Sequence, residues 1–223
     1  MKKVIIFDLD GTLLDTLEDL QKAVNFALSH FDYPLRTLEQ VRKDIGNGVA
    51  KLMERSTPNG LDNPNYTKAL EIFKEYYGKN YNVHTHAYSG MLDVVKELKK
   101  DGFIVTVATN KIIDVAKELL DIHYPDQFDF IQGDAVGVHK KPHSDMINNI
   151  INHYKVDIKD VLYVGDTNVD EETALNGKVD YVLVTYGYRT REEIKNSCVC
   201  TNLVNTPEEL LNFIRKTIWS YQR

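Results

Sequence analysis

The sequence has very little cysteine, no long hydrophobic run and no block of basic residues. Only two of its 223 residues are cysteines, Cys198 and Cys200, which excludes a disulfide scaffold, and we expect no bridge between them. No apolar stretch reaches the roughly 18 residues of a membrane span. The apolar run 4–7 is shorter than the roughly 7–15 residues of a secretory signal. We therefore expect a cytoplasmic protein with no membrane partner.

Acidic residues outnumber basic ones. The chain has 33 Asp and Glu against 27 Lys and Arg, a formal net charge of -6, which argues against a nucleic-acid partner. With 43% hydrophobic and 27% charged residues, it has a globular composition. Its length allows one large domain or two small ones. An anionic substrate would need a local cation to overcome the net negative charge.

Short apolar runs rich in Val, Ile and aromatic residues predict the strands of a covered parallel sheet. They span residues 3–7, 103–108, 128–132, 161–164 and 181–185. Helical patterns lie between them, and Thr206-Pro207-Glu208-Glu209 predicts the capped start of a final helix. This alternation predicts a doubly wound α/β fold.

Residues 16–87 break the alternation because they contain no convincing strand. A helical stripe begins at Leu17, and Thr37-Leu38-Glu39-Gln40 has the pattern of a capping box before another helix. We expect residues 16–87 to form a small α-helical cap domain. The catalytic core would then consist of residues 1–15 and 88–223.

Four predicted strands are followed by polar residues of the kinds used in catalysis. These are Asp8 and Asp10 after the first, Thr109 and Asn110 after the second, Lys141 beyond the third, and Asp166 after the fourth. Taken singly, each is more simply a turn, a helix cap or a surface residue. The carboxyl ends of parallel strands share one edge of the sheet, however, so their joint occurrence predicts one site.

Clustered carboxylates repel one another unless a cation lies between them, and an all-oxygen ligand set suits Mg²⁺. Magnesium commonly contacts substrate phosphate as well, so a phosphorylated small metabolite is the expected partner. One carboxylate can attack phosphorus, and a second can protonate the leaving oxygen and later deprotonate water. Asp8 and Asp10, two residues apart, fit these two roles. Thr109 and Lys141 are placed to hold the phosphoryl group, and Asn110 is a further candidate for substrate binding.

These motifs resemble those of the haloacid dehalogenase-like hydrolase superfamily over essentially the whole chain. The first motif is Phe7-Asp8-Leu9-Asp10-Gly11-Thr12, the second is Thr109, the third is Lys141 in Lys-Pro, and the fourth is Gly165-Asp166 with Asp170. The resemblance implies a Rossmann-like core, an inserted small cap and an aspartyl-phosphate intermediate.

The resemblance also implies a role for each matching residue. Asp8 is the nucleophile and Asp10 the general acid and base, while Thr109 and Lys141 bind the phosphoryl group. Magnesium would be held by the Asp8 carboxylate, the Asp10 backbone carbonyl and the Asp166 carboxylate. Asp170 would orient either a metal-bound water or Lys141.

Within the superfamily, two residues favour a phosphatase. Haloacid dehalogenases lack the second aspartate, Asp10, and β-phosphoglucomutases tend to carry a different residue at Thr12. A β-phosphoglucomutase-like isomerase is the alternative, and pyrophosphate, sugar phosphates and nucleotides are alternative substrates. A non-catalytic protein on this fold would normally have lost the nucleophile or a metal ligand, and none is lost here. The sequence does not indicate an oligomeric state.

A glycine-rich turn, Gly46-Asn47-Gly48, lies in the predicted cap. It resembles the substrate loop of phosphoglycolate phosphatases, so phosphoglycolate is the leading substrate. The glycines permit positive φ and expose backbone N–H groups at the start of a helix. A plain helix–helix turn is the alternative. Arg55 is a candidate contact for an acidic group of the substrate, or one half of a surface ion pair.

Several other groups are expected to be structural. The spacing of His123, His139, His143 and His153 fits no metal site, and Cys198 and Cys200 are expected in a partly buried strand. The segment 186–189 resembles the family's Gly-x-Arg segment and is expected to border the active site.

Overall fold

The structure is a computed structural model that describes residues 3–219. Residues 1–2 and 220–223, into which the predicted core extends, lie outside the described residues. The chain divides into two compact units, one made of Met1–Leu14 with Ala87–Arg223 and the other of Asp15–His86. Short strands β2 (Leu14–Asp15) and β3 (His86–Ala87) pair where the chain passes from one unit to the other.

The first unit is built on a six-stranded sheet with the order β5-β4-β1-β6-β7-β8, in which neighbouring strands are parallel. The strands are β1 (Val4–Phe7), β4 (Ile104–Ile112), β5 (Phe130–Asp134), β6 (Val161–Gly165), β7 (Asp180–Val184) and β8 (Leu203–Val204). The helices are α5 (Met91–Lys100), α6 (Ile113–His123), α7 (Asp145–Tyr154), α8 (Asn168–Gly177), α9 (Arg191–Ser197), α10 (Pro207–Trp219) and the 3-10 helix η2 (Ile158–Asp160).

Strand β1 lies at the centre of the sheet because its residues are apolar on both faces. All four are fully buried, and burial of each large side chain contributes about 1.5–3 kcal/mol. On one side Phe7 is in register with Val107 of β4, and on the other with Val164 of β6. The strand order reverses direction at β1, which places a crevice at the carboxyl ends of these three strands.

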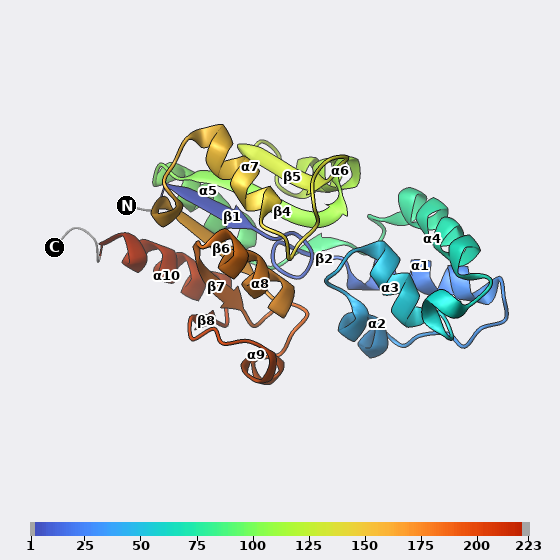
Figure 1. The fold of residues 1–223 in the computed structure, drawn as a ribbon. Coiled ribbons are helices and arrows are strands. Elements are labelled where there is room, and N and C mark those ends of the chain that lie inside the picture. Colours follow the sequence, from blue (N-terminus) through green and yellow to red (C-terminus); the bar gives the residue numbers. More distant parts are fainter. Residues whose placement is uncertain (1–2, 220–223) are drawn as a thin grey trace. The chain divides into compact units, whose positions relative to one another are not determined.

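Helices cover both faces of the sheet. Met146, Ile147 and Ile150 of α7 pack in one cluster with Ile6 and Tyr163. Figure 1 shows α7 in front of the sheet and α5 behind it, and α5 packs beside α10. The predicted stripe on α5 is confirmed, since Met91, Val94, Val95 and Leu98 are all buried. The predicted doubly wound α/β class is therefore confirmed.

Two strand predictions need correction. Strand β4 continues to Ile112, four residues past its predicted end, and its pairing with β5 shifts register between Ala108 and Ile112. Thr109 therefore lies in the strand, and the next helix begins only at Ile113. The short edge strand β8 was not expected. Cys198 and Cys200, predicted in a strand, lie in irregular chain before β8, and both are free thiols.

The second unit is helical. It contains α1 (Leu17–Ser29), α2 (Leu38–Asp44), α3 (Val49–Ser56), the 3-10 helix η1 (Gly60–Asp62) and α4 (Tyr66–Asn80). The predicted capping box is confirmed: Thr37 Oγ1 accepts the Gln40 N–H, and Gln40 Oε1 accepts the Thr37 N–H. Helices α1 and α4 pack against each other. Within the described residues, no helix is long and apolar enough to cross a membrane.

Candidate active site

The carboxyl ends of β1 and β6 place two aspartates side by side. Asp8 directly follows β1, and its backbone N–H donates to the Val164 carbonyl at 2.8 Å. Asp166 directly follows β6 and is fully buried. Asp8, Asp166 and Asp170 each offer a carboxylate oxygen, and these oxygens lie within 4.8 Å of one another. The structure thus brings together residues that lie more than 150 positions apart in the sequence.

Lys141 reaches into this cluster from the loop between β5 and α7. Its ammonium lies 2.6 Å from Asp8 Oδ1 and 2.8 Å from Asp170 Oδ1, and it donates to the Tyr163 hydroxyl at 3.1 Å. The residue is only 4% exposed. An ammonium buried this deeply is stabilised by its carboxylate partners, so Lys141 is a fixed positive charge beside Asp8.

Asp170 is held by the first turn of α8. Its Oδ2 accepts from the backbone N–H groups of Asp166 and Thr167 and from the Thr167 hydroxyl at 2.8 Å. Its Oδ1 accepts from Lys141 and from the Tyr163 hydroxyl. Of the two roles expected for Asp170, the orientation of Lys141 has a direct contact in the structure.

The Asp10 carboxylate is held by Lys111, a residue that the sequence did not single out. Lys111 Nζ lies 2.8 Å from Asp10 Oδ1 and 3.0 Å from Oδ2, and its side chain is 5% exposed. In the sequence, Lys111 is visible only as the third residue of the polar stretch Thr109-Asn110-Lys111. A lysine in a polar stretch is usually a solvated surface residue, however, so this pattern alone does not indicate a buried partner for Asp10.

Thr109 and Asn110 are both buried at the end of β4. Thr109 Oγ1 accepts the Lys111 N–H at 3.2 Å. The Asn110 side chain donates to the Lys141 carbonyl and accepts the Lys141 N–H, so it holds the backbone of Lys141. Substrate binding by Asn110 stays a prediction.

The turn after β1 and the loop after β7 approach Asp166 closely. Tyr188 N–H donates to Asp166 Oδ2 at 2.7 Å, as expected for a segment that borders the site. Gly11 has φ 91°, and a Cβ there would lie 2.3 Å from Asp166 Oδ2. At Gly187 a Cβ would lie 2.1 Å from the Gly11 carbonyl. Only glycine fits at both positions, because the two backbones approach around one buried carboxylate.

Burial and mutual repulsion disturb the carboxylates of the cluster. Burial, assisted by repulsion from Asp170 and Asp10, raises the pKa of Asp8 to about 7 although Lys141 opposes it. Burial and the charges of Asp170 and Asp8 raise the pKa of Asp166 well above its usual range. Burial alone would lower the pKa of Lys141, but Asp170 and Asp8 raise it. Burial also opposes ionisation of Asp170, yet contacts to Lys141 and Thr167 lower the pKa of this carboxyl.

The predicted substrate turn lies in the helical unit, between α2 and α3. Gly46 and Gly48 have φ values of 130° and 82°, so the expected positive φ is confirmed at both. Asn47 Oδ1 accepts from Arg55 at 2.9 Å, and Arg55 also donates to the Asp44 carbonyl at 2.6 Å. Arg55 thus ties the turn to the end of α2. Contact of the turn or of Arg55 with substrate stays a prediction.

The structure also brings together two histidines that the sequence spacing did not connect. His139 Nδ1 and His143 Nδ1 lie 2.7 and 2.9 Å from the two carboxylate oxygens of Asp145, at an exposed position in the Lys141 loop. The expectation that the spacing of these histidines fits no metal site stays a prediction. The hydrogen bonds to Asp145 account for the arrangement.

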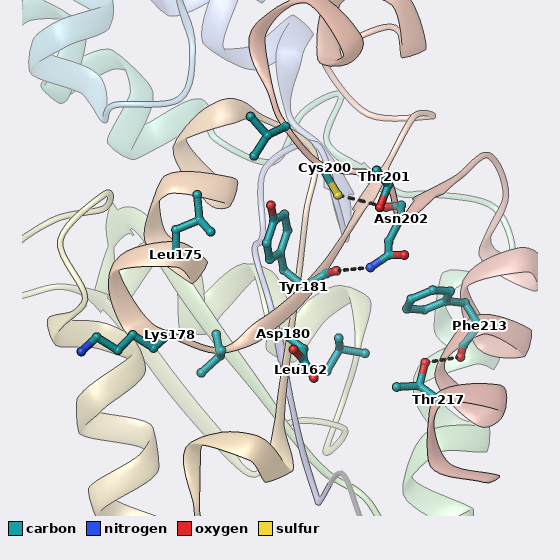
Figure 2. Close-up of a pocket in the computed structure, with 12 residues that line it drawn as sticks. Leu162, Leu175, Lys178, Asp180, Tyr181, Cys200, Thr201, Asn202, Phe213 and Thr217 are labelled. Atoms are coloured by element: carbon teal, nitrogen blue, oxygen red, sulfur yellow. Dashed lines mark hydrogen bonds between the residues drawn. The ribbon is translucent and has the colours of Figure 1, made fainter. Parts of the chain in front are cut away.

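A cleft of about 700 Å³ lies elsewhere in the first unit, and Figure 2 shows the residues that line it. It is bordered by Leu162 and Asp180, near the starts of β6 and β7, and by Phe213 of α10. Asn202, which also lines the cleft, donates from its side chain to the Tyr181 carbonyl. Strand β6 leads to Asp166 at its opposite end, and none of the residues that line the cleft belongs to the acidic cluster, so the cleft is separate from the candidate active site.

The chain belongs to the haloacid dehalogenase-like hydrolase family, because the sequence profile of that family matches residues 5–184. Its relatives include the phosphoglycolate phosphatases of Vibrio parahaemolyticus and Vibrio cholerae, which are 32% and 33% identical over 203 residues. Both alignments cover 87% of this chain and 89% of the relative. The predicted family and the predicted phosphatase class of enzyme are confirmed by these matches.

Solved structures agree with this assignment. The crystal structure of a protein from Lactobacillus delbrueckii subsp. bulgaricus, provisionally assigned as a phosphoglycolate phosphatase, superimposes on this chain with a TM-score of 0.91. The two sequences are 29% identical. The match covers 96% of this chain and 99% of the other. The similarity therefore extends through both compact units.

Proposed function

We propose that the chain is a Mg²⁺-dependent phosphatase of a small phosphorylated metabolite and acts through a phosphorylated Asp8. The observation that carries this proposal is the contact of Lys141 with Asp8 inside a buried cluster of three carboxylates. A buried carboxylate next to a fixed ammonium and a metal site is suited to attack an anionic phosphoryl group. The charges that would repel the substrate are then neutralised locally.

The cluster has the charge and the ligand chemistry for one magnesium ion. Asp8, Asp166 and Asp170 bring three negative charges, and Lys141 supplies one positive charge, which leaves two negative charges for a divalent cation. Burial and, after it, repulsion between the carboxylates raise the pKa values of Asp8 and Asp166, and a bound cation would oppose both effects. Carboxylate and carbonyl oxygens suit Mg²⁺. We assign it to the Asp8 and Asp166 carboxylates and the Asp10 carbonyl.

When bound, Mg²⁺ would act as a Lewis acid on the phosphoryl oxygens. An Asp8 oxygen attacks phosphorus, the P–O bond to the leaving group breaks, and the leaving oxygen takes a proton from Asp10. Water then attacks phosphorus, Asp10 accepts its proton, and the bond between Asp8 and phosphorus breaks. Lys141 and Thr109 hold the phosphoryl oxygens through both steps, while Lys111 orients Asp10.

We assign the role of cap to the helical unit, with boundaries near residues 16 and 87. In this role it excludes water and selects the leaving group. The turn 46–48 and Arg55 would contact that part of the substrate. Phosphoglycolate is the leading substrate, supported by the turn and by the names of the relatives.

A side-by-side panel of phosphate esters tests this proposal. We expect hydrolysis that requires Mg²⁺, with the highest kcat/KM for 2-phosphoglycolate among pyrophosphate, sugar phosphates and nucleoside monophosphates. A different preferred ester would overturn the substrate assignment alone. Conversion of β-glucose 1-phosphate to glucose 6-phosphate with a bisphosphate primer would instead establish the isomerase. An absence of Mg²⁺-dependent release of phosphate from every ester would overturn the function.

A further inference from the structure

Tyr163 brings a buried hydroxyl to the carboxylate cluster of the candidate active site. The residue lies in β6, in register with Ile6 of β1, and it is fully buried. Its ring packs against α7 in the hydrophobic core, which fixes the position of the hydroxyl. The hydroxyl lies 3.1 Å from Lys141 Nζ and 3.1 Å from Asp170 Oδ1. A residue of the core thus ends in the polar site.

The Lys141 ammonium has an acceptor for each of its hydrogens. It carries three N–H donors. Its acceptors are Asp8 Oδ1 at 2.6 Å, Asp170 Oδ1 at 2.8 Å and the Tyr163 hydroxyl. In the proposed reaction Lys141 also holds a phosphoryl oxygen. One of the three present bonds must therefore be given up when the substrate is bound.

Asp170 is not the partner that Lys141 can release. Its Oδ1 accepts from Lys141 and from the Tyr163 hydroxyl. Its Oδ2 accepts from the backbone N–H groups of Asp166 and Thr167 and from the Thr167 hydroxyl. A carboxylate offers about four lone-pair sites, so these donors saturate it. A carboxylate held in this way stays in place when the substrate binds.

Tyr163 is fixed to the same carboxylate. Burial raises the pKa of its hydroxyl well above the usual range, so the hydroxyl keeps its proton. It donates that proton to Asp170, since the Ala108 carbonyl lies farther away at 3.5 Å. The hydroxyl oxygen then accepts from Lys141. Loss of that bond would leave a buried acceptor without a donor, which is unfavourable.

Asp8 differs from both, because its carboxylate accepts a hydrogen bond from Lys141 alone among the residues that the structure describes. This bond is therefore the replaceable one. In the proposed reaction Asp8 loses its charge when it bonds to phosphorus, and the phosphoryl oxygens bring negative charge to the same place. Lys141 can follow the charge with one N–H while the other two stay bound.

We propose that Tyr163 is a positioning residue for phosphoryl transfer. Together with Asp170, its hydroxyl takes up two of the three Lys141 N–H groups, so that the third, which lies on Asp8, is the one passed to a phosphoryl oxygen. Tyr163 acts on the reaction through Lys141. Without the hydroxyl, one N–H has no partner, and the ammonium can turn away from phosphorus. This inference rests on the proposed function, because it concerns the same site.

Replacing Tyr163 with Phe tests the role of the hydroxyl by itself. Phe keeps the buried ring and its contact with Lys141, whose ammonium lies 5.8 Å from the ring centroid. The matched control is Tyr181→Phe. Tyr181 is in register with Tyr163 on β7, and its hydroxyl donates to Glu171 at 2.9 Å, away from Lys141.

We expect Tyr163→Phe to lower kcat about tenfold, as for the loss of one hydrogen bond to a charged group. KM should change by less than about twofold, because the lost bond orders Lys141 for the transfer step and not for binding. Tyr181→Phe should retain a normal kcat. Circular dichroism of each variant should match that of the unchanged protein at the assay temperature.

Three outcomes would contradict these expectations. A normal kcat in Tyr163→Phe, with or without a raised KM, would overturn the inference and leave the proposed function intact. An equal loss of kcat in Tyr163→Phe and Tyr181→Phe would also overturn it, because the effect would then be structural. If the unchanged protein hydrolysed no ester in the presence of Mg²⁺, the proposed function itself would fail.

The unchanged protein offers a second test that does not depend on a variant. Orthovanadate with Mg²⁺ mimics the five-coordinate phosphorus of the transfer step, so a crystal structure of this complex shows where Lys141 donates. We expect Lys141 Nζ to keep its bonds to Asp170 and to the Tyr163 hydroxyl and to donate to one vanadate oxygen. An ammonium that has left the Tyr163 hydroxyl would overturn the inference.

Discussion

The side-chain amide of Asn110 holds the backbone of Lys141 through both of its polar atoms. Asn110 Nδ2 donates to the Lys141 carbonyl at 3.0 Å, and the Lys141 N–H donates to Asn110 Oδ1 at 2.7 Å. Both residues are buried. The pair fixes the chain from which the Lys141 ammonium reaches Asp8, so Asn110 is a positioning residue for the charge beside the nucleophile.

Replacing Asn110 with Ala should lower kcat by about 10–100-fold, the usual cost of losing a partner that orients a catalytic group. The physical reason is that Lys141 loses both backbone anchors and no longer holds its ammonium against Asp8. Steady-state kinetics measure kcat and KM, and Asn110→Asp serves as the second variant because it keeps only the acceptor. If Asn110→Ala raised KM and left kcat unchanged, Asn110 would be a substrate contact instead.

Replacing Lys111 with Met should reduce kcat while the protein remains folded. Met keeps most of the buried aliphatic chain and removes the ammonium that orients the Asp10 carboxylate, so we expect a loss of about 10–100-fold. The acid limb and the base limb of the pH–rate profile should also change, because Asp10 acts in both proton transfers. Lys140→Met is the matched control. Lys140 also pairs with an aspartate, Asp134, but this pair is more exposed and does not involve Asp10. An unaltered pH profile in Lys111→Met would contradict the assigned role.

The sequence predicted the centre of the sheet and most of the cluster, and the physical reason is the same for both. Runs that are apolar on both faces, such as β1, can only be central parallel strands, and residues at their carboxyl ends must then converge. Asp8, Asp10, Asp166 and Lys141 follow from this rule, whereas Asp170 was expected only from the family resemblance. The strand β4 was predicted too short because Thr109, Asn110 and Lys111 are polar, although the site buries them.

Contacts between distant side chains could not be predicted in the same way. A buried lysine is recognised only from its partner, and the partner of Lys111 lies 101 residues away at Asp10. The expected capping box at α10 formed only in part, because Thr206 Oγ1 accepts the Glu209 N–H while the Glu209 carboxylate binds the Asn205 N–H. Strand β8 has two residues, too few to show a pattern.

Replacing Gly11 with Ala should disturb Asp166 more than it disturbs the fold. The positive φ costs about 1 kcal/mol for Ala, and the added Cβ would lie 2.3 Å from the Asp166 carboxylate, which has to move. We expect weaker Mg²⁺ binding and lower activity at saturating substrate. Isothermal titration with Mg²⁺ measures the first effect. Gly102→Ala is the control, because it also has positive φ but no atom lies near its added Cβ. Equal Mg²⁺ affinity in both variants would contradict the placement of Asp166.

The metal-free protein should become less stable as pH rises from about 4 to about 7. The pKa of Asp8 is raised in the folded state to about 7 from its ordinary 3.8, so the folded state binds more protons within this window. Stability then falls with pH as the buried Asp8 is forced to ionise. Asp166, whose pKa is also raised, acts in the same direction.

Magnesium should reverse this trend, because it stabilises the ionised carboxylates. The rise in Tm on adding Mg²⁺ should therefore be larger at pH 8 than at pH 5.5, and Asp8→Asn in EDTA should unfold later than the unchanged protein at pH 8. Differential scanning calorimetry at several pH values measures both. A Mg²⁺ effect that is independent of pH would show that the metal does not bind the buried carboxylates.

The identity of the nucleophile is tested most directly by acid-quenched single-turnover mass spectrometry with Mg²⁺ and 2-phosphoglycolate, or with the best ester of the panel. We predict one phosphoryl group on the peptide that carries Asp8. We also predict no phosphopeptide and no turnover from Asp8→Asn, in a protein whose circular dichroism is unchanged. A phosphoryl group found on another residue, or more than a few per cent of normal turnover in Asp8→Asn, would contradict it.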